Sequence, residues 1–336
     1  MWATGADERE DGVTERLLFG GVELGGSKCV CLLGTGPDDI VDKAVLPTGA
    51  HADVTLRQIE NVLADWQGRH GRIRALGIAS FGPVDLREES AHFGHIMSTV
   101  KAGWSGTDIV GRLRGAHGMP IGFNTDVVAA ALAEARWGRA RGLADFAYIT
   151  VGTGVGVGLI VGGKPTFGCN HTELGHIRIV RAPADRWPGS CPFHGDCVEG
   201  LASGPAIAAR TGMPAESISD DDPVWKLVAH ALAQLIQALL LATAPRRVLI
   251  GGGVALGRPQ LFALVRELLV ESVNGYLNLE ELTGGVTDYI VSPALGAHAG
   301  PLGALALAAD AHVRSQELLQ APLPWARTAP QRGNAE

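Results

Sequence analysis

The stretch from Gly152 to Gly204 gathers three kinds of residue that could do chemistry. It contains the runs VGTGVGVGLIVGGKP, HTELGHIRIV and CPFHGDCVEGLASG. The first is a glycine turn suited to a phosphate, the second offers an acid and a histidine, and the third has cysteines and a histidine at metal-binding spacing. We therefore expect the other elements of the chain to be arranged around this stretch.

Two glycine-rich turns between strand-like segments have the composition of phosphate-binding loops. They are Gly25-Gly26-Ser27-Lys28 and Gly152-Thr153-Gly154-Val155-Gly156. A backbone without side chains approaches a phosphate closely and aims several N–H groups at it. A plain strand bend has the same composition, so both interpretations stay open for each turn alone. Gly251-Gly252-Gly253 after a third strand-like segment favours the phosphate interpretation, although no GxxxxGK[ST] run occurs.

Asp126 lies where a predicted strand meets an alanine-rich helical segment. An aspartate at such a junction caps the helix or interacts with its dipole as a first-turn acid. It could also act as a general base that deprotonates a substrate hydroxyl, as phosphoryl transfer requires. The spacing alone favours the cap.

A Cys/His cluster offers the four ligands of a closed tetrahedral zinc site. Cys191-x2-His194-x2-Cys197 supplies three ligands, and His176 upstream supplies the fourth. A site with four protein ligands has no open position, so the zinc would be structural rather than catalytic. The alternative is a pair of free thiols and a surface histidine, because His176 is separated from Cys191 by a long loop.

Glu173 and Glu199 flank this cluster. Carboxylates accept pairs of hydrogen bonds from vicinal hydroxyls, which suits a sugar, although exposed loop acids are the ordinary explanation for both residues. A loop held rigid by a metal would fix their geometry. Phe81 and Trp104 could line a sugar pocket, and packing in the core is their default role.

Composition limits the class of protein. The chain has 336 residues, 46% hydrophobic and 19% charged, which is enough for two hydrophobic cores and predicts two domains. The formal net charge of −7 argues against nucleic acid as a partner and favours a small ligand.

The chain shows no secretory signal and no convincing membrane span. The N-terminal run MWATGADEREDGVTER is acidic and lacks an apolar segment. The longest apolar run, 225–242, contains Lys226, His230, Gln234 and Gln237, so it predicts a buried helix of a soluble protein. The five cysteines fit a reducing cytoplasm rather than a disulfide framework.

The remaining sequence alternates between strand-like and helical patterns. Strands are predicted at 17–23, 28–33, 41–46, 73–79, 120–123, 146–151, 155–161, 247–250 and 289–291, and His176 lies on a possible further strand. Helices are predicted at 53–66, 108–113, 127–137, 203–209, 223–242, 259–273 and 300–309, with Asp222-Pro223 as cap and first turn of the long one. The two glycine turns thus predict one strand–turn–strand device used twice.

The motifs follow one another in the order of a known family. The chain resembles the ROK family of sugar kinases, and within it the bacterial fructokinase group, from about Leu18 to Ala309. The segments that match are VELGGSKCVCLLG, ASFGPVDL, STVKAGWSGTDIVG, GFNTDVVAAALAEARWG, YITVGTGVGVG, ELGHIRI, CPFHGDCVEGLASGPAI and GGGVALG.

The resemblance implies an α/β fold of the two-domain acetate kinase/Hsp70/actin-like (ribonuclease H-like) type, with ATP in the interdomain cleft. The expected boundaries are a disordered acidic tail at 1–16, an N-terminal domain at 17–123 completed by a helix at about 300–315, a C-terminal domain at 124–299 with a zinc-binding segment at 176–197, and a frayed tail at 321–336. The family pattern also suggests a homodimer.

The resemblance also implies roles for individual residues. Asp126 matches the catalytic base, which reverses the preference for a cap. Glu173, His176 and Glu199 match positions that contact the sugar, and His176, Cys191, His194 and Cys197 match zinc ligands. ATP would be bound by Gly25, Gly26, Ser27, Lys28, Gly152, Thr153, Gly154 and Gly156, with Gly251, Gly252 and Gly253 beside the adenosine, and Mg²⁺ would bridge its phosphates near Glu23.

The chain departs from the fructokinase pattern at three places. Asn124 and Val128 replace Asp and Asn of a DTDVN run, the segment 98–104 lacks the prolines of STPKPGW, and 296–300 replaces a GDNAG-like run. These departures concern the choice of sugar and the efficiency more than the reaction type, because Asp126 is retained.

The sequence therefore predicts ATP-dependent phosphorylation of a hexose, with fructose to fructose 6-phosphate as the first choice. Mannose, glucose or an amino sugar are alternative substrates. A silent sugar-binding protein is a further alternative because of Asn124 and Val128. A sugar-responsive transcription regulator is disfavoured, since the residues before Leu17 are too few and too acidic for a helix-turn-helix.

Overall fold

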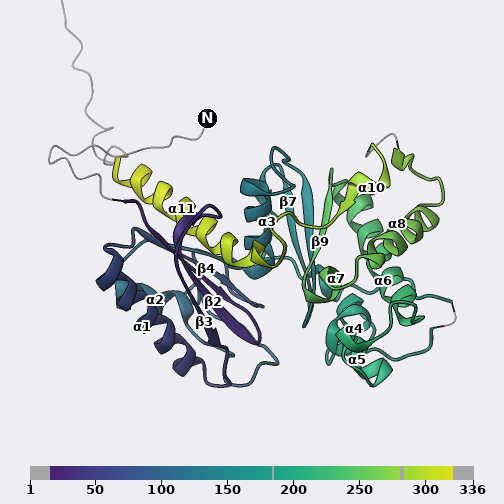
Figure 1. The fold of residues 1–336 in the computed structure, drawn as a ribbon, viewed down its shortest axis with the longest axis horizontal. Coiled ribbons are helices and arrows are strands. Elements are labelled where there is room, and N and C mark those ends of the chain that lie inside the picture. The colour runs from purple at the N-terminus through teal and green to yellow at the C-terminus, as the bar shows by residue number, and fades with distance from the viewer. Residues whose placement is uncertain (1–15, 184, 281–283, 321–336) are drawn as a thin grey trace, which may run out of the picture.

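The computed structural model describes residues 16–183, 185–280 and 284–320. Two five-stranded sheets lie side by side, each covered by helices (Figure 1). The expected tails at 1–16 and 321–336 fall outside the described residues, apart from Arg16.

The first sheet has the strand order β3-β2-β1-β4-β5. Its strands and the helices between them are β1 (Phe19–Leu24), β2 (Lys28–Gly36), β3 (Asp39–Pro47), α1 (Ala52–His70), β4 (Ala75–Ser80), α2 (Ile109–His117) and β5 (Ile121–Thr125). Strands β1 and β2 are antiparallel, as are β2 and β3, whereas β4 and β5 run parallel to β1.

The second sheet repeats this arrangement with the order β10-β9-β6-β7-β8. Its elements are α3 (Asp126–Trp137), β6 (Phe146–Val151), β7 (Val155–Val161), β8 (Lys164–Pro165), η1 (Leu174–His176), α4 (Val198–Ala202), α5 (Gly204–Thr211), η2 (Ala215–Ser217), α6 (Val224–Thr243), β9 (Val248–Gly251), α7 (Gly253–Leu256), α8 (Gln260–Val273), α10 (Val286–Tyr289) and β10 (Ile290–Val291). Strand β6 pairs antiparallel with β7 and parallel with β9. The predicted repeated strand–turn–strand device is confirmed, and the repeat extends to the whole sheet.

The chain ends on the first sheet. After η3 (Gly296–His298), helix α11 (Ala299–Gln320) runs across the molecule and packs on β1, β4 and β5 (Figure 1). Three glycines, Gly21, Gly77 and Gly122, lie in register on those strands, and a Cβ on any of them would collide with the backbone of α11. The glycine row therefore lets the helix lie directly on the sheet. We call residues 16–125 together with α11 the N-terminal half, and the described residues between 126 and 298 the C-terminal half.

The predicted elements are present, several of them extend beyond their predicted ends, and the short elements β8, α4, α7 and α10 were not predicted. Helix α1 runs to His70 and α11 to Gln320, each beyond the predicted end, because a helix can continue past its regular apolar stripe, which in α1 ends at Trp66. His176 is not on a strand, because it is the last residue of the short helix η1. The preceding residue, Gly175, packs so closely against the Val155 backbone that a side chain there would collide with it. Helix α6 begins at Val224 with Pro223 at the cap position, one residue later than predicted, and the Asp222 Oδ1 accepts from the Val224 N–H at 2.8 Å.

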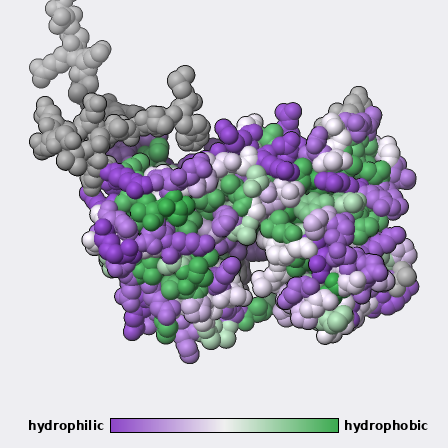
Figure 2. Space-filling model, in the orientation of Figure 1, coloured by the Kyte–Doolittle hydropathy of each residue, from purple (hydrophilic) through white to green (hydrophobic). Residues whose placement is uncertain are grey.

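Helix α6 is the centre of the C-terminal core. By length and composition it could cross a membrane, yet 61% of its most apolar window is buried inside the fold. Its buried residues pack with α4, α8 and the second sheet in one apolar cluster. This agrees with the predicted buried helix. Figure 2 shows a recess between the two halves, flanked by mixed polar and apolar surface.

Candidate active site between the two sheets

The two glycine turns close the first hairpin of each sheet. In the first, the Gly25 N–H donates to Lys28 O at 3.1 Å. In the second, the Gly152 N–H donates to Gly154 O at 2.9 Å, and Gly152 O accepts from the Gly204 N–H at 2.7 Å. The second turn is therefore attached to the start of α5. Gly156, predicted as part of that turn, lies on β7 and faces Val127 of α3.

A cavity of about 470 Å³ lies beside the second turn. Its lining combines the turn with the starts of α5 and α7 and with η2: Gly152, Thr153, Gly204, Pro205, Ala208, Pro214, Ala215, Glu216, Gly253 and Val254. The volume is within the range of small-molecule and cofactor sites. The structure thus brings the second turn and Gly253 together, as the sequence predicted for a nucleotide pocket, and adds an apolar wall from 205–215 that the sequence did not indicate.

Asp126 is the first residue of α3, and it is not the cap. Thr125 is the cap, because its Oγ1 accepts from the Val128 N–H at 3.3 Å. The Asp126 Oδ1 accepts from the Val127 N–H at 2.8 Å. Burial, reinforced by the charge of Glu173, raises the pKa of Asp126 to about 6. The carboxylate therefore lies at the start of α3 without serving as its cap.

Four carboxylates form an electrostatically coupled row across the site. Burial and the charge of Asp126 raise the pKa of Glu23, at the end of β1, to about 7. Asp126 is in turn coupled to Glu173, whose pKa is raised by burial and by Glu199. Like charges held close together in a folded protein are typical of functional sites rather than of packing. The row joins the N-terminal sheet to the C-terminal helix α4.

Glu199 links the second glycine turn to the Cys/His cluster. Its Oε2 accepts from the Val155 N–H at 3.1 Å, and its Oε1 lies 3.9 Å from His176 Nε2. Glu173 Oε1 lies 3.4 Å from His171 Nδ1. Of the two acids predicted to bind a sugar, Glu199 is therefore held by the second glycine turn. Each acid also lies beside a histidine, Glu199 beside His176 and Glu173 beside His171.

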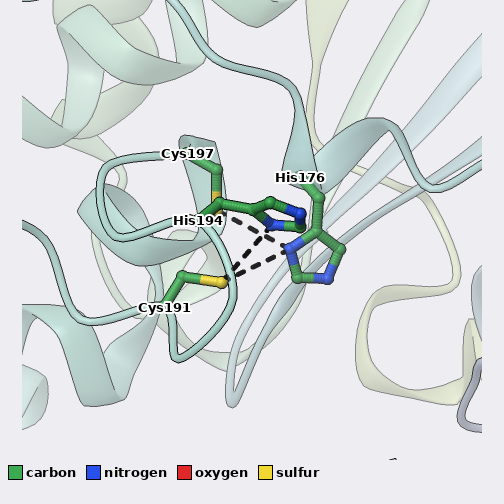
Figure 3. A group of neighbouring side chains, drawn as sticks. All are labelled: His176, Cys191, His194 and Cys197. Atoms are coloured by element: carbon green, nitrogen blue, oxygen red, sulfur yellow. Dashed lines mark hydrogen bonds between the residues drawn. The ribbon is translucent and has the colours of Figure 1, made fainter. Parts of the chain in front are cut away.

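The four predicted metal ligands point toward one another (Figure 3). Cys191 Sγ lies 3.7 Å from His176 Nδ1 and 3.6 Å from His194 Nδ1, and Cys197 Sγ lies 3.6 Å from His176 Nδ1. Zinc bonds of ordinary length to sulfur and nitrogen give a tetrahedral S–N edge of about 3.6 Å. The four ligand atoms lie within 4.8 Å of one another, so the donor set fits a tetrahedral zinc ion.

The remaining nitrogen of His176 faces Glu199. A metal-ligating histidine commonly directs its second ring nitrogen to a carboxylate, which fixes the ring orientation. The two roles predicted for His176 are therefore compatible, one for each ring nitrogen.

Phe81 and Trp104 lie together at the edge of the N-terminal half. Their rings are 5.3 Å apart in an edge-on arrangement, and Trp104 is fully buried with its Nε1 donating to Gly49 O at 2.8 Å. Trp104 is a core residue, in line with its default role, whereas Phe81 is partly exposed.

Lys101 holds the first glycine turn, a contact that the sequence did not indicate. Its Nζ donates to Gly26 O at 2.6 Å and to Thr48 O at 3.1 Å. The residue is part of the 98–104 segment that departs from the fructokinase pattern, and no local signal shows which backbone it reaches. The lysine places a positive charge at the turn.

The two departures beside Asp126 have local explanations. Asn124 Oδ1 accepts from the Thr125 N–H at 2.9 Å. Val128 is buried in α3. With both residues present, Asp126 is the first residue of α3.

Comparisons with known proteins agree with this geometry. The ROK family pattern matches residues 19–311 of the chain. The fructokinase of Pediococcus pentosaceus is 37% identical over 87% of this chain and 98% of its own length, and the fructokinase of Zymomonas mobilis is 35% identical over 88% and 97%.

A solved structure has the same fold. The ROK family glucokinase from Streptomyces griseus, in complex with glucose and AMPPNP, superposes with a TM-score of 0.68 and is 26% identical, covering 87% of this chain and 99% of that one. The chain belongs to the ROK family.

Proposed function

We propose that the protein is an ATP-dependent hexose kinase that converts fructose to fructose 6-phosphate. The observation that supports this best is the position of Asp126, coupled on one side to Glu23 near the first glycine turn and on the other to Glu173 beside the Cys/His segment. A base between a nucleotide site and a sugar site is what transfer of a phosphoryl group to a hydroxyl requires.

The nucleotide would lie between the two turns. The cavity beside Gly152 and Gly253 would accommodate the adenosine, and the turns would present backbone N–H groups to the phosphates. The Streptomyces griseus glucokinase, which binds AMPPNP, supports this assignment. Mg²⁺ would be held near Glu23 and supply positive charge to the phosphates when bound. Lys28 and Lys101 add charge at the first turn.

The sugar would be bound by Glu173, Glu199 and His176. Carboxylates accept hydrogen bonds from vicinal hydroxyls, and the three side chains are fixed by contacts to the second turn and to His171. Fructose is the substrate favoured by the similarity to the fructokinases of Pediococcus pentosaceus and Zymomonas mobilis. Asp126 would take the proton from the attacking hydroxyl while the hydroxyl oxygen bonds to the terminal phosphorus, and the bond from that phosphorus to the bridging oxygen would break so that ADP leaves.

Zinc has a structural role in this proposal. The donor set leaves no open position on the ion, so its function is to hold 176–197 in place beside Glu199. We further propose domains at 17–123 and 124–299, with α11 completing the first, and a cytoplasmic homodimer. The domain proposal is supported by the two separate sheets.

A coupled assay that measures ADP in the presence of fructose, mannose, glucose and glucosamine tests the reaction. The expected result is sugar-dependent ADP release, largest with fructose. Asp126→Asn is expected to lower kcat by about three orders of magnitude, because it removes the base, while calorimetry still detects sugar binding. Asp65→Asn, a remote surface change on α1, is the matched control with unchanged turnover. Near-normal turnover of Asp126→Asn would refute the assignment.

The pH dependence provides an independent check on the same residue. Only the deprotonated carboxylate can accept a proton, so kcat is expected to rise as pH increases through about 6. Folding raises the pKa of Asp126 above its unfolded value of 3.8, so the free energy of unfolding falls as pH rises between about 4 and 6. Asp126→Asn is therefore expected to melt at a higher temperature than the wild type at pH 7.5. A pH-independent kcat would contradict the role of this carboxylate.

A further inference from the structure

A short hairpin of the C-terminal half reaches the N-terminal half. It spans residues 167–171, where Phe167 pairs with His171 and the Gly168 N–H donates to Asn170 O at 3.1 Å. The hairpin follows β8 and leads directly to Glu173. Its two last side chains bind the segment 83–86, which continues from β4 through Phe81. The contact therefore crosses between the halves at the end of the site predicted for the sugar.

Asn170 satisfies two backbone groups of that segment with one amide. Its Nδ2 donates to Val84 O at 2.9 Å, and its Oδ1 accepts from the Leu86 N–H at 3.3 Å. The orientation of the amide is determined by chemistry, since a carbonyl requires a donor and an N–H requires an acceptor. Asn170 thus pairs with the segment as a neighbouring strand would.

His171 binds the same segment and faces Glu173. Its Nε2 lies 3.1 Å from the Val84 N, which can only donate, so Nε2 is the acceptor. The proton of the neutral ring is then on Nδ1, which lies 3.4 Å from Thr172 O and 3.4 Å from Glu173 Oε1. The side chain of His171 is 5% exposed, and its burial lowers its pKa, which favours the neutral ring.

Glu173 lies against the N-terminal half as a result. A Cβ placed on Gly82 would be 3.3 Å from Glu173 Oε1 and 3.5 Å from the His171 ring. The Glu173 side chain remains 48% exposed, so the carboxylate is available to a ligand while its position depends on the hairpin.

We propose that Asn170 and His171 form a clasp between the two halves that positions Glu173 for the sugar. The proposal rests on the proposed function. It adds two residues whose loss weakens binding of the sugar and not of the nucleotide. None of the clasp residues lines the cavity of about 470 Å³ beside the second glycine turn. Loosening the clasp therefore changes the sugar site and leaves the nucleotide pocket in place.

Asn170→Leu and His171→Leu test the clasp, because each keeps roughly the volume and removes the hydrogen bonds. Each is expected to raise KM for fructose at least tenfold and to change KM for ATP less than twofold. His171→Gln retains an acceptor for the Val84 N–H, so its KM for fructose is expected between those of His171→Leu and the wild type. Cys169→Ser, at the exposed tip of the same hairpin, is the matched control with wild-type constants.

Amide hydrogen exchange at Val84 and Leu86 separates this proposal from the proposed function. The Leu86 amide is expected to exchange faster in Asn170→Leu and the Val84 amide faster in His171→Leu than in the wild type, because each variant removes the acceptor of that amide. An equal rise in KM for fructose and ATP, or no rise for fructose, overturns the positioning role. A wild-type chain without sugar-dependent turnover overturns the proposed function, and unchanged exchange in the variants would then overturn the clasp as well.

Discussion

The two glycine turns occupy the same place in the two repeated sheets but have different surroundings. Each joins the first antiparallel pair of its sheet. A Cβ on Gly26 would meet no described atom within 4 Å, whereas a Cβ on Gly154 would lie 2.6 Å from Glu199 Oε2. The first turn is open on its outer side, and the second is filled by a carboxylate of the site.

The turns also differ in what holds them. The first is bound by Lys101, which comes from a loop of the same half, and by the Thr48 N–H, which donates to Ser27 O at 3.0 Å. The second is bound by the Gly204 N–H and by Glu199, which belong to the segment that follows the Cys/His cluster. The two turns therefore have the same place in their sheets, and they differ in the residues that contact them.

This difference predicts separate kinetic signatures. Damage to the first turn should affect the nucleotide alone, because no predicted sugar residue is bonded to it. Damage to the second turn should also affect the sugar, because Glu199 contacts both the turn and His176.

Removal of the metal should have the largest effect and should distinguish the two turns most clearly. Dialysis against a chelator, or Cys197→Ser, is expected to lower activity more than a hundredfold, because the segment that holds Glu199 loses its anchor. Hydrogen-exchange mass spectrometry should show faster exchange at 150–156 and 190–204, with little change at 24–30.

Metal analysis of the purified protein accompanies that measurement. One zinc per chain is expected in the wild type and in Cys169→Ser, whose cysteine is exposed and outside the cluster. A metal-free protein with full activity and unchanged exchange would show that the cluster is not an anchor.

Paired alanine substitutions compare the turns directly. Gly154→Ala is expected to raise KM for fructose by about tenfold and to lower kcat, because the new methyl group displaces the Glu199 carboxylate. Gly26→Ala has room in the protein, so a rise of about threefold in KM for ATP, with KM for fructose unchanged, would report a phosphate close to the turn. Steady-state kinetics with each substrate varied in turn measures both. Equal effects of the two variants on fructose would contradict the comparison.

The repeated fold and the Cys/His cluster could be predicted from the sequence because their signals are local. Strand, glycine turn and strand follow one another at Gly25 and again at Gly152, and three of the four metal ligands lie within seven consecutive residues. The extent of the repeat could not be predicted, since β3 and β8 share topology without sharing sequence.

Contacts between segments that are far apart in the chain could not be predicted from the sequence. Thr125 and Asp126 are both acceptable caps by type, and only the backbone geometry shows that Thr125 is the one used. Asn170 and His171 meet Val84 from more than eighty residues away, and no periodicity encodes such a pairing. The same holds for Lys101 and Gly26.

Lys101→Met should have the smallest effect and isolates the first turn. The variant keeps the apolar stem and removes two charge-assisted hydrogen bonds to Gly26 O and Thr48 O. Because the bonds are near the surface, we expect a rise of only about threefold in KM for ATP, with KM for fructose unchanged. Lys101→Arg keeps a cation at the turn and should remain within twofold of the wild type. A change in KM for fructose would mean that the first turn also communicates with the sugar site, and the two turns would then differ in strength of attachment rather than in role.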